Sequence, residues 1–204
     1  MEKYFFMKRV LDLISQGNFF TKVFSIALRV AAVVAALAGL VGFVSGWKIV
    51  FEMPAAGILG GIIFQALFVV AIYMVVHTLI IRANDIAGLP VTDFTVIPIA
   101  SIFLKLVGEV YACFTATIAV GGGILMWFAE GYGGYLLRRV IPFMPSFGGE
   151  SFLGGIVFIL GGVLLAFFVL LFFYLMSESI VVMVEIAKNT KHIRLIAEQH
   201  GKNK

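Results

Sequence analysis

The chain has 204 residues, of which 62% are apolar and 13% are charged, and its formal net charge is +4. Because soluble domains carry about 25% charged residues, this composition excludes an ordinary soluble domain and predicts an integral membrane protein. Cys113 is the single cysteine, which excludes an intrachain disulfide and a cysteine-based metal centre. The three histidines are scattered, so we expect no metal site and no cofactor. In a membrane chain the placement of basic residues reports orientation, so we expect no nucleic-acid partner.

The first 22 residues mix apolar and charged side chains, a pattern typical of an amphipathic helix in the membrane interface. A cleaved signal peptide is the alternative. It is disfavoured because the apolar run begins near Val23 and carries Arg29 inside it. We therefore expect residues 1–22 to be retained as an interfacial helix.

Four apolar stretches follow, and the last contains 25 residues without a charge, from Phe152 to Met176. At about 1.5 Å per residue, a helix of this length crosses a hydrocarbon core of roughly 30 Å. The sequence therefore predicts an all-α membrane domain over residues 23–182, with a cytoplasmic helical tail over residues 183–204. The predicted spans are Val23–Trp47, Gly57–Ile81, Pro98–Phe128 and Phe152–Val182.

The basic residues predict the orientation, because cytoplasmic loops carry an excess of lysine and arginine. Only Lys48, Arg138 and Arg139 fall on the side of the two outer loops. We therefore predict a multi-pass protein of the cell membrane, in particular a bacterial inner membrane, with both termini in the cytoplasm. The opposite side carries Lys3, Lys8, Arg9, Lys22, Arg82, Lys188, Lys191, Arg194, Lys202 and Lys204.

An internal repeat indicates how the spans are organised. The segment Ile58–Gly61 aligns with Ile159–Gly162, and His77 then falls on Glu178. Aligning Trp47 with Trp127 places Arg29 on Glu109. This pattern predicts two tandem hairpins related by an axis along the membrane normal. Chance similarity between apolar helices is the alternative.

Each predicted span also carries an ionisable residue about 20 positions from its outer end. One interpretation is a polar cavity in the inner leaflet that holds an ion, a proton or a lipid headgroup. The structural alternative is that the basic side chains reach the headgroups and that Lys105 neutralises Glu109. The residues of this layer are Arg29, His77, Lys105, Glu109 and Glu178.

The tail continues the fourth span with apolar residues at alternating spacings of four and three. This spacing is the a/d pattern of a coiled coil, and a single polar core residue such as Asn189 can fix its register. The pattern predicts self-association, although it covers little more than two heptads. The alternative is a helix on the membrane surface whose basic residues contact anionic lipid headgroups. The predicted seam consists of Val182, Ile186, Asn189, Ile193 and Ile196.

No phosphate-binding loop, nucleophile motif or zinc-protease motif occurs in the sequence. An intramembrane enzyme that uses Glu109 and His77 is a third, weaker hypothesis. The favoured prediction is a non-enzymatic multi-pass membrane protein that acts as an oligomeric subunit or scaffold. Its expected partners are the lipid bilayer and further copies of itself or a larger membrane complex. The alternative function is a small channel or transporter that uses the inner-leaflet polar cavity.

Overall fold

The computed structural model describes residues 18–90, 96–129 and 152–202, and these residues are almost entirely helical. They form α2 (Asn18–Phe51), α3 (Ala55–Ala87), α4 (Val96–Phe128) and α6 (Phe152–Lys202). All four helices are long and apolar enough to cross a membrane. The prediction of an all-α, four-helix membrane protein is therefore confirmed.

The helices are longer than the predicted spans at most of their ends. The helices α2, α3 and α4 contain 33 or 34 residues, which is about 50 Å at 1.5 Å per residue. The extra turns follow from backbone hydrogen bonding, which continues through the polar residues that flank an apolar stretch. Residues 18–22 thus belong to α2, and the rest of the predicted interfacial helix lies outside the described residues.

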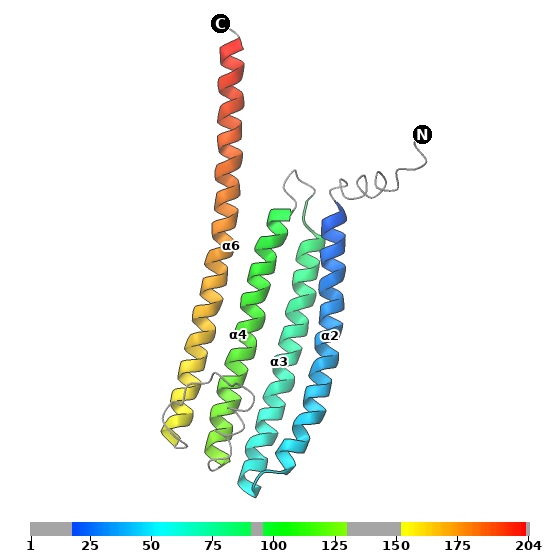
Figure 1. The fold of residues 1–204 in the computed structure, drawn as a ribbon, viewed down its shortest axis with the longest axis vertical. Helices are drawn as coiled ribbons and strands as arrows, with labels where there is room; N and C mark the ends of the chain where they lie inside the picture. The colour runs from blue at the N-terminus through cyan, green and yellow to red at the C-terminus, as the bar shows by residue number, and fades with distance from the viewer. Residues whose placement is uncertain (1–17, 91–95, 130–151, 203–204) are drawn as a thin grey trace, which may run out of the picture.

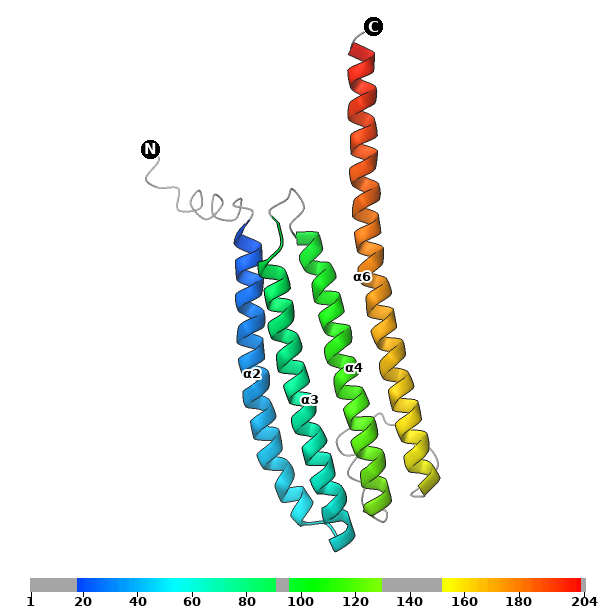
Figure 2. The same cartoon turned by 180° about the vertical axis from the view of Figure 1, so that it is seen from behind.

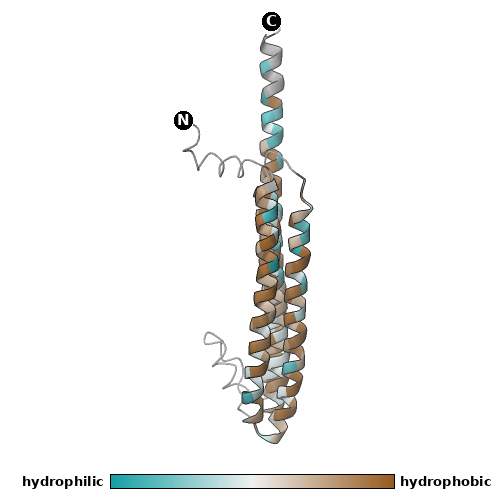
Figure 3. Cartoon of the chain, turned by 90° about the vertical axis from the view of Figure 1, so that its right-hand side faces the viewer, coloured by the Kyte–Doolittle hydropathy of each residue, from teal (hydrophilic) through white to brown (hydrophobic). Residues whose placement is uncertain are grey.

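The four helices stand side by side in an open row (Figures 1 and 2). The helix α3 packs against α2 on one side and α4 on the other, and α6 packs against the far side of α4. We call the end where α2 and α3 are joined the turn end, and the opposite end, beyond which α6 projects, the extension end. Figure 3 shows apolar residues along the row and more hydrophilic residues on the projecting part of α6.

Glycines bring the neighbouring helices into close contact, as is common in membranes. A Cβ atom built on Gly46 of α2 would lie 2.0 Å from the Gln65 side chain of α3. That side chain donates a hydrogen bond to the carbonyl of Phe43, 3.3 Å away. A Cβ atom built on Gly162 of α6 would lie 2.3 Å from the Cβ atom of Ala119 in α4. The α4–α6 interface therefore requires the absence of a side chain at Gly162, whereas the flexible Gln65 side chain would have to move to make room at position 46.

The adjacent pair Gly161 and Gly162 gives a matched test of this packing. We expect Gly162→Ala to destabilise the protein by about 1–3 kcal/mol, the usual cost of overpacking a close interface. Gly161→Ala should leave the monomer intact, because its Cβ atom would meet nothing within 4 Å. Reversible unfolding in detergent measures both variants. Equal destabilisation would contradict the observed close packing of α4 against α6.

Candidate functional site

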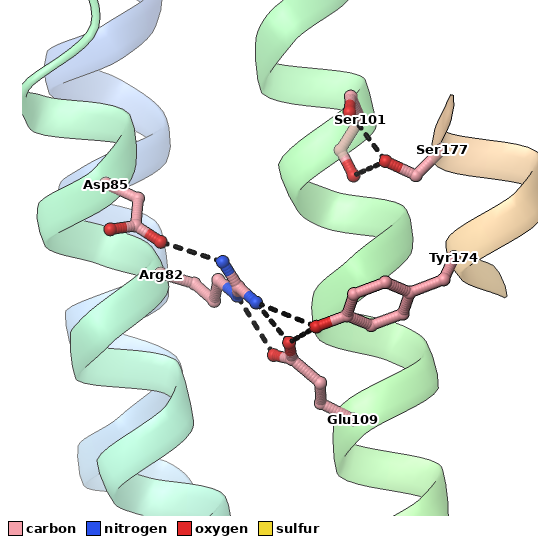
Figure 4. Close-up of polar contacts among 6 residues, drawn as sticks. All are labelled: Arg82, Asp85, Ser101, Glu109, Tyr174 and Ser177. Atoms are coloured by element: carbon pink, nitrogen blue, oxygen red, sulfur yellow. Dashed lines mark hydrogen bonds and ion pairs between the residues drawn. The ribbon is translucent and has the colours of Figure 1, made fainter. Parts of the chain in front are cut away.

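Three side chains from three helices meet in the half of the row nearer the extension end. The guanidinium of Arg82 in α3 contacts both carboxylate oxygens of Glu109 in α4, and its Nε donates to Oε2 at 2.9 Å. The hydroxyl of Tyr174 in α6 donates to Oε1 of Glu109 at 2.5 Å. Figure 4 shows these side chains pointing toward one another. We call them the Arg82–Glu109–Tyr174 network.

Two further charged residues adjoin the network. Asp85 accepts a hydrogen bond of 2.9 Å from Nη1 of Arg82, so the guanidinium is held between two carboxylates. The Nζ atom of Lys105 lies 5.4 Å from the centre of the Tyr174 ring, within the range of a cation–π contact. The side chains of Arg82 and Glu109 are only 19% and 17% exposed. Arg82 and Glu109 therefore form a largely buried ion pair.

The packing of α4 against α6 explains why Tyr174 reaches Glu109. The residue before Glu109 is Gly108, where a Cβ atom would lie 2.7 Å from the Cβ atom of Phe173. The two backbones therefore approach closely at this level, and the next residue of each helix enters the network. Nearer the extension end, the buried hydroxyls of Ser101 and Ser177 form a second polar link of 2.6 Å.

The network satisfies its own hydrogen-bonding groups. Burying an ion pair costs desolvation energy, which is recovered only when the geometry is good and other polar atoms have partners. Both carboxylate oxygens of Glu109 accept hydrogen bonds, and the Tyr174 hydroxyl donates one of them. Among the described residues, no buried side-chain nitrogen or oxygen lacks a partner. This arrangement can fasten three helices together, and it leaves neither a free base nor a free nucleophile within the network.

The structure brings together only two residues of the predicted polar layer, Glu109 and Lys105, which both adjoin Tyr174. Glu109 pairs with Arg82 instead of with Lys105. The spacing of Lys105 and Glu109, one helical turn apart, permits a pair, but Arg82 offers a bidentate guanidinium from the neighbouring helix.

The other three predicted residues are exposed and lie outside the network. Arg29 is exposed and donates a hydrogen bond of 3.1 Å to the Asn84 side chain of α3. His77 is exposed and stacks on Tyr73, with ring centres 5.8 Å apart and planes 9° apart. Glu178 is exposed on α6, one turn beyond Tyr174, and lines an open pocket with Tyr174 that does not include Glu109. These three side chains do not share a cavity with Glu109.

Sequence reasoning missed two members of the network, Arg82 and Tyr174. Arg82 lies one residue beyond the predicted span Gly57–Ile81, because the apolar stretch ends at Ile81. The residues from Arg82 to Ala87 contain no proline or glycine, which is the signal that the helix continues. Tyr174 lies inside the predicted span Phe152–Val182, where its hydroxyl gives no indication of a partner. No residue of the repeat pattern indicates that a tyrosine should meet Glu109.

The helices and their polar links define a multi-pass α-helical membrane protein. Comparisons of the chain with protein-family models, curated proteins and solved structures found no match.

The network makes a prediction about stability. Glu109→Ala should destabilise the protein by about 1–3 kcal/mol, because it leaves Arg82 partly unpaired in a buried position. A double-mutant cycle with Arg82→Ala should show strong coupling, since the two side chains share one interaction. Reversible unfolding in detergent measures the cycle. Arg29→Ala is the control, and it should cost less because the bond from Arg29 to Asn84 is exposed. Additive effects of the two network substitutions would argue against a stabilising interaction between Arg82 and Glu109.

Proposed function

We propose that this protein is a non-enzymatic membrane subunit or scaffold that assembles through the projecting part of α6. The observation that carries this proposal is the exposed apolar stripe on that projection. Ile186 and Ile193 are 60% and 67% exposed, and Val182 is 52% exposed. Asn189 lies between them and is also exposed. The side chain of Ile196, the last predicted seam residue, lies outside the described part of the chain.

The length of α6 supports a location outside the bilayer for most of this stripe. Ile186 follows Phe152 by 34 positions, about 51 Å along a helix. A bilayer with its headgroup regions is about 40–45 Å thick. If α6 enters the outer interface near Phe152, residues from Ile186 onward are in water. Lipid cannot cover apolar side chains there, so their exposure has a cost.

The projection also lacks a neighbouring helix in the described chain. Ser177 pairs with Ser101, only five residues after the start of α4 at Val96. Beyond the start of α4, α6 continues without a neighbouring helix in the described chain (Figure 1). In proteins, most of the stability of a helix comes from packing its apolar face against another surface. A second copy provides such a surface, because all copies insert into the membrane in the same orientation and their projections run parallel.

The excess of basic residues on this side supports a cytoplasmic location for the projection. A bacterial inner membrane is part of the same proposal. Contact of the projection with anionic lipid is the competing interpretation. One of its basic side chains, Arg194, donates a hydrogen bond of 2.8 Å to Glu198, so the charge of this arginine is partly offset by a neighbouring carboxylate. The projection also extends away from the row and does not turn toward the other helices (Figure 2). Both features favour self-association over a helix lying on the membrane.

The network supports a structural role for the membrane domain. Its charges pair with one another and join α3, α4 and α6. In a subunit that assembles through α6, the network would hold α6 in place against α4 and α3. A channel or transporter has no observation of similar weight in its favour among the described residues.

The assembly hypothesis predicts the effect of charges in the stripe. The double variant Ile186→Glu with Ile193→Glu should convert an oligomer into a monomer, because buried carboxylates would oppose one another across the seam. Light scattering coupled to size-exclusion chromatography in mild detergent measures the mass. Both residues are exposed in the monomer, so its fold should be retained.

Ala187→Glu provides the matched control, since Ala187 is exposed but lies outside the a/d stripe. This variant should keep the oligomer. A monomeric wild-type protein, or an oligomer that survives the double variant, would overturn assembly through this stripe.

A further inference from the structure

The helix α6 is continuous from Phe152 to Lys202, so its membrane-spanning and projecting parts share one helical phase. The a/d positions of the projection can therefore be followed into the membrane in steps of seven residues. From Val182, the d positions lead back to Leu175, Phe168 and Gly161. From Ile186, the a positions lead back to Ser179, Phe172 and Leu165. We call these six residues the membrane part of the seam.

The membrane part of the seam faces away from the rest of the chain. Phe168 and Phe172 are 60% and 55% exposed, and Leu165 and Leu175 are about half exposed. The residues that contact α4 are different: Ala166 is 4% exposed and Ser177 is fully buried. Ser179 places no unsatisfied hydroxyl on the seam, because it donates to its own helix at the Leu175 carbonyl.

Gly161 provides an observation that does not depend on the heptad pattern. The neighbouring glycines Gly155 and Gly162 are explained by packing, since a Cβ atom on either would clash with α4. A Cβ atom on Gly161 would meet nothing within 4 Å. Glycine weakens a helix relative to alanine, and nothing within the described chain requires it here. A closely approaching partner helix would explain it, because small residues permit close contact between helices in membranes.

We propose that two copies of the chain pair in parallel along α6 through the membrane as well as beyond it, with their closest approach at Gly161. This inference rests on the self-association proposed above. The proposed partner is a second copy. Two copies have the same orientation in the membrane, so a twofold axis along the membrane normal places the same seam residues of both α6 helices opposite one another. A lipid acyl chain could cover the membrane part of the seam. Lipid would not explain why Gly161, which has no packing partner in its own chain, lies at a seam position, three steps of seven residues before Val182. A left-handed supercoil keeps such a seam in register over several heptads.

Disulfide crosslinking can test the membrane part separately from the projection. In full-length protein with Cys113→Ser, a single cysteine replaces Phe168 on the seam or its neighbour Phe167 off the seam. The two positions are matched, since these phenylalanines are 60% and 57% exposed. A third variant, Ile193→Cys, reports on the projection. After oxidation in native membranes, the dimer fractions are compared on non-reducing gels.

We expect Phe168→Cys and Ile193→Cys to form dimers and Phe167→Cys to form few. If only Ile193→Cys forms dimers, assembly through the projection stands and the membrane seam is overturned. If none of the three forms dimers, both proposals fail. Equal crosslinking at Phe167 and Phe168 would indicate random collision and would also overturn the seam.

Substitution of Gly161 tests the close approach. Gly161→Leu should raise the dimer dissociation constant about tenfold or more, as expected for overpacking a tight interface. The monomer should retain its helical content and melting behaviour, because Gly161 faces open space within its own chain. Phe167→Leu, off the seam, is the control. An unchanged dissociation constant for Gly161→Leu would overturn the proposed close approach.

Discussion

The interior of a bilayer offers no hydrogen-bond partner, and this constraint shapes the whole membrane domain. Backbone groups must be satisfied within each segment, so every crossing is a helix. The same constraint applies to side chains. In the part of the chain that the structure describes, Arg82, Glu109 and Tyr174 satisfy one another, and the hydroxyls of Ser101 and Ser177 form a pair. Polar groups buried in the row are thus used to join helices.

Close packing and polar bonding have different roles in the row. Helices in lipid gain little from the hydrophobic effect, so their association depends on van der Waals contact and interhelical bonds. Glycines such as Gly108 and Gly162 allow that contact on the α6 side of α4. This close contact sets which residues of α4 and α6 lie at the same level. The hydrogen bond from Tyr174 to Glu109 then holds the two helices in that register. The helix α4 is fastened on both sides, to α3 through Arg82 and to α6 through Tyr174.

The number and approximate position of the spans could be predicted because hydropathy and charge directly reflect the membrane environment. The partners of Glu109 could not be predicted from the sequence. Arg82 reaches Glu109 from the next helix, and that register is set by contacts such as Gly121 against Phe64. The helices are apolar nearly all round, so periodicity does not reveal which face meets which neighbour. The proposed repeat stays a prediction. The order in which the helices pack, α2 on α3, α3 on α4 and α4 on α6, is compatible with a duplicated hairpin and also with four unrelated helices.

The two parts of α6 differ in what can drive their association. Beyond the bilayer, burying Ile186 and Ile193 removes apolar surface from water, which supplies a free-energy gain. Within the bilayer the same kind of contact only replaces lipid, and its value depends on how well the surfaces fit. The projection would therefore supply most of the affinity, and Gly161 would set the distance between the two helices. Because α6 is unbroken, pairing of the projection also aligns the membrane segments and reduces the entropy lost when they meet.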